Sequence, residues 1–168
     1  MSNVTPQHAD FLLRLYEMRR EPRLRQARAW FMDNFNVTTM AELMAVCPPG
    51  TDNNAMMRQV LSFWDMCANF VNRGLIDEEF FWETSGEQFI VFERFKPVLG
   101  EIRAMFKNPQ FLAHLEEHCR RMEAWREQRA PGSVAALRDF MKQQAAARSG
   151  ATATAAATGV AATAKAAS

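Results

Sequence analysis

The segment His114-Leu115-Glu116-Glu117-His118 has the residue types and spacing best suited to catalysis in this chain. It fits the pattern H-x-x-E-H, in which two histidines on one helix face hold a zinc ion and the glutamate acts as a base. Such a site needs a third ligand, and the acidic residues beyond His118 are Glu123, Glu127 and Asp139. The apolar stripe of the same helix leaves His118 at its border and His114 in solvent. We therefore predict no metal and no other cofactor, keep His114 and His118 as weak metal candidates, and rank a metal-dependent hydrolase third.

A cluster of arginines near the start of the chain suggests a different chemistry, and its members are Arg14, Arg19, Arg20, Arg23, Arg25 and Arg28. Guanidinium groups bind phosphate through paired hydrogen bonds. Phosphate or nucleic-acid binding through this Arg14–Arg28 cluster, with Arg19, Arg20, Arg23, Arg25 and Arg28 as the contacts, is therefore our second hypothesis. An acidic run comes later, and comprises Asp77, Glu78, Glu79, Glu83, Glu87 and Glu93. Because the net charge is only +1, we favour an arrangement in which the two charged segments face each other, within one chain or between subunits.

Aromatic side chains gather in the same region as the acidic run, at Phe80, Phe81, Trp82, Phe89, Phe92 and Phe95. Such clusters usually form a core, and their second common place is a subunit interface. Our leading hypothesis is a non-enzymatic interaction or regulatory protein that self-associates through aromatic and opposite-charge surfaces. Its expected partner is a second copy or another protein. It predicts that Phe81→Glu or Trp82→Glu changes the oligomeric mass.

Composition narrows the class of protein. With 168 residues, 48% of them hydrophobic and 23% charged, the chain suits one globular domain. Cys47, Cys67 and Cys119 are odd in number and far apart, which suits free thiols in a reducing compartment. We find neither a signal peptide pattern after Met1 nor an apolar run of about 18–20 residues that could span a bilayer. We therefore predict a cytoplasmic protein with no membrane partner.

Local signals predict helices throughout the first part of the chain. Thr5-Pro6 and Glu21-Pro22 open helices to about Arg20 and Asn34, and Thr39 to Glu42 form a capping box. The surest helix covers residues 53–73, with apolar side chains on one broad face and Gly74 at its end. Asp77 can cap the next turn, and we expect a further capping box at Ser85 to Gln88. Pro97 should kink or restart the following helix, and Asn108-Pro109 should open another over residues 110–128.

The predicted fold class is all-α, an irregular helical bundle of six to eight helices. We find no period-2 run bounded by turn residues, so no sheet is expected. We place a single domain at residues 1–147. The stretch 148–168 is nearly all Ala, Thr and Gly, and it has no apolar stripe that could dock on the domain. We predict that it is a disordered tail.

Three stretches of sequence carry a resemblance. They are NFVNRGLIDEEFFW (Asn69 to Trp82), F-x-x-FKPVLGEIR (Phe92 to Arg103) and NPQFL (Asn108 to Leu112). Together they resemble a bacterial family of small helical proteins known only as a domain of unknown function, over roughly Phe11 to Glu123. The resemblance implies an all-helical fold and no activity, and some members are tethered to a membrane by an N-terminal span that this sequence lacks. It also implies where a shared binding site would lie, at Asn69, Asn72, Asp77, Trp82 and Arg103.

Overall fold

The structure of the protein is a computed structural model, and the residues described here are 4–147. This part of the chain contains eight helices and no strand, which confirms the predicted all-α class and the number of helices. The helices are α1 (Pro6–Arg19), α2 (Pro22–Asn34), α3 (Met40–Val46), α4 (Asp52–Asn72), α5 (Glu78–Thr84), α6 (Glu87–Met105), α7 (Ala113–Arg129) and the segment 133–147. The predicted disordered tail, residues 148–168, lies outside the described residues.

The chain divides into two compact units, with the boundary between Met122 and Glu123 inside α7. The first unit holds α1 to α6 and the beginning of α7. In the second unit, the carboxylate of Glu127 accepts backbone N–H groups of Gly132 at 2.8 Å and Val134 at 3.0 Å, which stabilises the turn that follows α7. That the chain folds as one domain over residues 1–147 stays a prediction.

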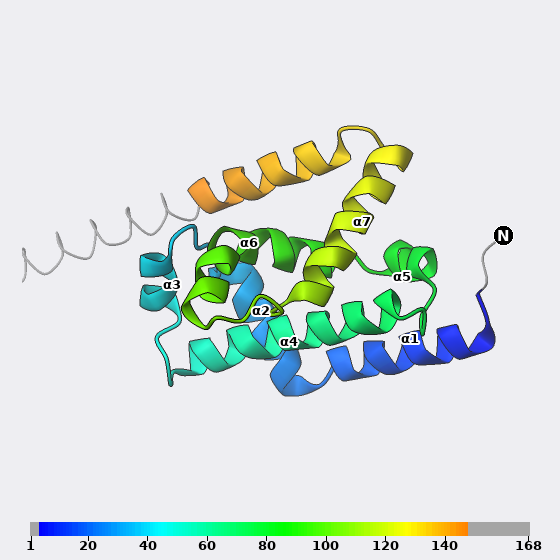
Figure 1. Ribbon diagram of the computed structural model, residues 1–168, viewed down its shortest axis with the longest axis horizontal. Helices are drawn as coiled ribbons and strands as arrows, with labels where there is room; N and C mark the ends of the chain where they lie inside the picture. Colours follow the sequence, from blue (N-terminus) through cyan, green and yellow to red (C-terminus); the bar gives the residue numbers. More distant parts are fainter. Residues whose placement is uncertain (1–3, 148–168) are drawn as a thin grey trace, which may run out of the picture. The chain divides into compact units, whose positions relative to one another are not determined.

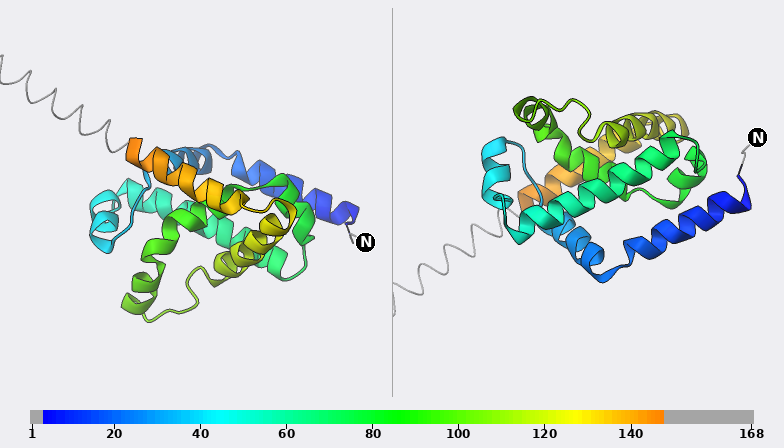
Figure 2. Two further views of the ribbon diagram at one scale, coloured as in Figure 1. Left: turned by 90° about the horizontal axis from the view of Figure 1, so that it is seen from above. Right: turned by 60° about the horizontal axis from the view of Figure 1, so that its bottom comes forward.

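Helix α4 is the centre of the first unit (Figure 1). It packs against α2, α5 and α6. The views in Figures 1 and 2 agree that α1 runs alongside it, and the rings of Phe11 and Phe70 lie 5.7 Å apart. The buried face of α4 follows the helical repeat predicted from the sequence, and its members are Met56, Met57, Val60, Leu61, Phe63, Trp64, Cys67, Ala68 and Val71.

Several helix ends are stabilised by neighbours in the sequence, as predicted. Thr39 and Glu42 form the capping box at the start of α3, and the Asp77 carboxylate accepts the N–H of Phe80 at 2.9 Å at the start of α5. Gly74 follows α4 with a φ of +73°, a conformation that glycine adopts without the strain a Cβ would cause.

Two other helix ends are stabilised by residues far away in the sequence. The buried Arg94 of α6 donates from Nη1 to the carbonyl oxygens of Phe31 at 3.2 Å and Met32 at 2.6 Å, which belong to the last turns of α2. Such a cation at a helix C-terminus satisfies carbonyl groups and the negative end of the helix dipole. Asp65 of α4 accepts the backbone N–H of Leu115 at 2.9 Å and so caps the start of α7.

Candidate functional site

One candidate site is a cavity of about 500 Å³ between α3, α4 and α6, which we call the α3–α4–α6 cavity. Its lining comes from these helices, from the loop between α3 and α4, and from the connection between α6 and α7. The lining residues are Met40, Leu43, Met44, Cys47, Pro49, Asn54, Met57, Arg58, Phe95, Ile102, Phe106, Asn108 and Phe111. Sites for small molecules have volumes of about 300–1,000 Å³ and mostly apolar walls with a few polar groups. The cavity meets both criteria.

Three side chains supply the polar part of this lining. The Nδ2 group of Asn54 donates to the backbone oxygen of Cys47 at 3.3 Å, and the side-chain oxygen of Asn108 accepts the N–H of Gln110 at 3.1 Å. Arg58 is exposed and is the one charged residue among those that line the cavity. Its guanidinium has no ion-pair partner within residues 4–147.

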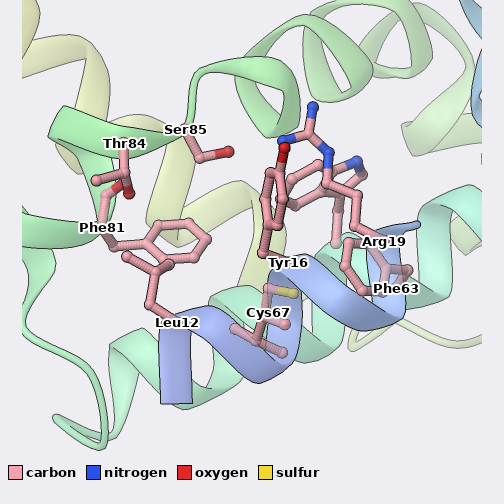
Figure 3. A pocket seen from close by; sticks show the side chains of 10 residues that line it. Leu12, Tyr16, Arg19, Phe63, Cys67, Phe81, Thr84 and Ser85 are labelled. Atoms are coloured by element: carbon pink, nitrogen blue, oxygen red, sulfur yellow. The ribbon is translucent and has the colours of Figure 1, made fainter. Parts of the chain in front are cut away.

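A second, much smaller pocket of about 50 Å³ lies between α1, α4 and α5. Figure 3 shows Leu12, Tyr16 and Arg19 projecting from α1 toward the segment that carries Phe81, Thr84 and Ser85. Trp64 also lines this pocket, and its buried Nε1 has no hydrogen-bond partner among the described residues. This volume holds a few water molecules, because each one needs roughly 10–15 Å³ of cavity volume. It is therefore too small for an organic ligand.

The arginine cluster is largely occupied by internal ion pairs. Arg19 and Arg28 both bind the carboxylate of Glu87, with Arg19 Nη2 to Oε2 and Arg28 Nε to Oε1 each at 2.6 Å. Arg23 pairs with Asp52. The predicted contact between the basic cluster and the acidic run thus occurs within one chain, at Glu87. Arg20 and Arg25 are exposed, and neither makes an ion pair with another residue that the structure describes.

The two imidazoles and the Glu117 carboxylate of the H-x-x-E-H segment lie in three different environments. His118 is fully buried and its Nε2 accepts the indole N–H of Trp82 at 3.2 Å. Glu117 is held by Arg120 and Arg121, whose hydrogen bonds and charges lower the pKa of its carboxyl group to about 2. His114 is exposed. Within residues 4–147, no three His, Cys, Asp or Glu side chains come close enough to hold a metal ion together.

Buried thiols make poor nucleophiles in this protein. All three cysteines are buried, and none forms a disulfide with a described residue. Burial raises the pKa of Cys47 to about 11 and that of Cys67 to about 12, because the thiolate would lose its hydration. Both thiols are therefore protonated at neutral pH.

The residues singled out by the family resemblance lie at helix ends and between helices, and none of them lines the cavity. Asn69 accepts from Arg73 Nε at 2.8 Å, and Asp77 caps α5. Asn72 donates to the backbone oxygen of His114 at 3.0 Å and accepts from Arg121 Nη2 at 2.7 Å. Trp82 binds His118, as described above.

Arg103, the last of these residues, donates from Nε to the backbone oxygen of Phe111 at 3.0 Å and from Nη1 to Glu116 at 2.8 Å. These bonds connect α6 to the segment that leads into α7. Because Phe111 lines the cavity, Arg103 positions a part of the cavity wall without reaching the cavity itself.

Sequence reasoning missed the cavity because no short motif marks it. Its walls come from segments that are far apart in the chain, so no spacing rule connects them. The one available signal was Met40, Met44 and Met57, since methionine is common at adaptable apolar binding surfaces. Nothing in the sequence places Arg58 beside a cavity.

The arrangement defines an all-helical protein in which a compact first unit contains a mostly apolar cavity with one cationic side chain in its lining. A family described as "Domain of unknown function (DUF4760)" matches residues 4–122, more than half of the chain, and the chain belongs to this family. The match ends at Met122, where the first compact unit also ends. It confirms the resemblance to a domain of unknown function.

No curated protein and no solved structure matches the chain. Among the described residues, no helix combines the length and the apolar character that crossing a bilayer requires.

Proposed function

We propose that this chain is a non-enzymatic interaction protein that binds a small molecule with an apolar body in the α3–α4–α6 cavity. The observation that carries this proposal is the cavity itself, about 500 Å³ with a mostly apolar lining. Apolar surface removed from water stabilises a complex by roughly 25 cal/mol per Å², so a ligand that fills this space has a strong driving force for binding. The non-enzymatic part is supported by the buried His118, the ion-paired Glu117 and the protonated Cys47 and Cys67.

Filling the cavity should weaken ligand binding. We expect Met44→Trp to raise the Kd of a neutral apolar dye, N-phenyl-1-naphthylamine, by about tenfold or more, equivalent to about 1.4 kcal/mol. Met44 lines the cavity from the half-exposed side of α3, so a larger side chain enters the cavity without overpacking the core. Dye fluorescence measured against protein concentration gives the Kd.

The matched control for this experiment is Ala45→Trp, which adds the same side chain at the next, exposed position of α3 outside the cavity lining. It should leave the Kd unchanged. The proposal is wrong if the wild-type chain does not bind the dye, or if both tryptophan variants weaken binding equally.

Self-association is a second candidate function, and a specific observation favours it. The side chains of Leu13 and Tyr16 are one helical turn apart on α1 and are 63% and 55% exposed. We place the candidate interface at these two side chains and not at the aromatic cluster. Phe81 and Trp82 are only 2% and 6% exposed and belong to the core. A glutamate at Phe81 or Trp82 would therefore disrupt folding and does not test self-association.

We expect the double substitution Leu13→Glu and Tyr16→Glu to convert an oligomer into a monomer, because two charges would have to be buried in the interface. Native mass spectrometry of the full chain measures the change in subunit number. Ala29→Glu, at an exposed position of α2, is the control that should keep the oligomer. A wild-type chain that is already monomeric contradicts this candidate.

Phosphate or nucleic-acid binding through the arginine cluster ranks below both candidates. Arg20 and Arg25 are the members of the Arg19–Arg28 set that are exposed and lack an ion pair with a described residue. Tight binding to a nucleic-acid backbone usually needs several such contacts. A cytoplasmic location is also part of the proposal, supported by the three cysteines, which form no disulfide among the described residues.

A further inference from the structure

We infer that the ligand of the α3–α4–α6 cavity is an anionic amphiphile, a molecule with an apolar chain or ring body and a single anionic head group, and that Arg58 binds this head group. The inference rests on the proposed function and names the chemical class of ligand for the same cavity. It follows from the charge, the hydrogen-bonding groups and the apolar wall of the cavity.

The charge of the lining has one sign. Arg58 is the single charged residue that lines the cavity, and no Asp or Glu faces it there. Other arginines of the first unit are neutralised by carboxylates at short range, as Arg19 and Arg28 are by Glu87 and as Arg103 is by Glu116. Arg58 has no such partner in the described part of the chain, so its charge is available to a ligand. A guanidinium binds a carboxylate or a similar anion through two parallel hydrogen bonds.

The neutral polar groups of the cavity lining are compatible with a bound anion. The side-chain oxygen of Asn108 already accepts the N–H of Gln110, which leaves its amide N–H groups as donors. Asn54 uses an amide N–H for the backbone oxygen of Cys47, and its side-chain oxygen is the one acceptor that it presents. The Cys47 thiol stays protonated, because burial raises its pKa to about 11, and so adds no negative charge. Donors therefore outnumber acceptors at the polar part of the lining.

The apolar wall suits a flexible ligand body. Met40, Met44 and Met57 have unbranched, adaptable side chains, and they line the same cavity as Phe95 and Ile102 of α6. Phe106 also lines the cavity yet is largely exposed, as is Arg58, so the cavity reaches the surface near both residues. A ligand can bury its body among the methionines while its charged end stays near water and the guanidinium.

The test compares ligands that differ only in the head group, using isothermal titration calorimetry on the full chain at low salt. Decanoate should bind about two- to fivefold more tightly than decan-1-ol, the range expected for an exposed charge pair, and decylammonium should bind most weakly. Arg58→Gln should remove the preference for decanoate, so that decanoate and decan-1-ol bind with similar affinity. Arg25→Gln, the same change at an exposed arginine outside the cavity lining, should keep the preference.

The outcomes separate this inference from the proposed function. Equal affinity for decanoate and decan-1-ol overturns the anionic head group and leaves the apolar cavity site intact. A preference for decanoate that survives Arg58→Gln overturns the role of Arg58. If neither compound binds, the inference and the proposed function both fail. Because Arg58 is exposed, the variant should fold, and circular dichroism confirms this before each titration.

Discussion

Glu87→Ala should lower the free energy of unfolding by about 3–5 kcal/mol, because it leaves two partly buried guanidinium groups without their carboxylate. The Glu87 side chain is 13% exposed and binds Arg19 and Arg28 at the same time. These bonds join α1 and α2 to the first turn of α6. Loss of the carboxylate therefore removes the polar connection between three helices, and it loosens the helix whose later residues line the cavity. Urea unfolding monitored by circular dichroism measures the difference.

The contribution of Glu87 should depend on pH. Burial raises the pKa of the Glu87 carboxyl group. The hydrogen bonds and charges of Arg28 and Arg19 lower this pKa by a larger amount, so the resulting pKa lies below the ordinary value. Because the folded pKa is below the unfolded pKa, the stabilisation is complete above the ordinary glutamate pKa of about 4.3 and is lost as the pH falls through the folded value. The difference in the free energy of unfolding between the wild type and Glu87→Ala should therefore shrink in strongly acidic solution.

Asp10→Asn is the matched control for Glu87→Ala. Asp10 pairs with Arg14 on the surface of α1, where the two side chains are 63% and 73% exposed. Removal of such a pair typically changes stability by about 0–1 kcal/mol. If Glu87→Ala costs no more than Asp10→Asn, the buried ion pair does not hold the three helices together.

His118→Met should abolish a loss of stability that the wild-type chain shows in mild acid. In the folded chain His118 Nε2 accepts the Trp82 N–H, and its Nδ1 is buried without a hydrogen-bond partner among the described residues. Burial first, and then the positive charge of Arg121, lower the pKa of His118 from 6.5 to about 4. The folded chain therefore keeps this imidazole neutral well into the acidic range.

The sign of the effect follows from the order of the two pKa values. As the pH falls below 6.5, the unfolded chain takes up the proton while the folded chain does not, so unfolding becomes more favourable. Between pH 6.5 and pH 4 the loss should reach about 3 kcal/mol, at 1.36 kcal/mol for each unit of pKa difference. Below pH 4 both states are protonated and this contribution no longer changes.

Urea unfolding of the wild type at pH 7.5, 6 and 5 measures this loss. In His118→Met the free energy of unfolding should no longer fall with pH over this range, since the thioether is neutral at every pH. The thioether can still accept weakly from the Trp82 N–H. His114→Gln, at an exposed position one helical turn earlier, should keep the wild-type decrease of the unfolding free energy in mild acid. A wild-type unfolding free energy that is constant between pH 7.5 and pH 5 would show that His118 is not held neutral by burial.

The predictions made from neighbouring residues were the most successful part of the sequence analysis. The helices over residues 6–34, the capping box at Thr39, the amphipathic α4 and the Asp77 cap all depend on contacts within about four residues. In these cases the hydrogen bond or apolar face that stabilises the element is encoded in the element itself. Tertiary packing then agrees with the local preference.

Two local predictions were wrong where long-range packing outweighs the local signal, and a third was wrong in one of its two alternatives. Ser85 does not cap α6: its hydroxyl donates to the side chain of Gln88, and Gly86 occupies the N-cap. Of the kink or restart expected at Pro97, the restart does not occur: α6 continues through Pro97, because its flanking apolar residues are buried in the core and offset the lost backbone bond. α7 begins at Ala113 and not at residue 110, since Leu112 has a φ of +56° and the distant Asp65 caps the helix.

The helical class, most helix boundaries and the free state of the thiols can be predicted from the amino-acid sequence, because each depends on local periodicity, capping chemistry or composition. Which charges meet, which aromatic residues form the core and where a ligand can bind depend on the three-dimensional fold. Glu87 attracts two arginines from distant helices, Phe81 and Trp82 are buried, and Arg58 lies beside a cavity whose walls come from separate segments. These features depend on how helices pack, and packing brings together side chains whose separation in the sequence carries no signal of their contact.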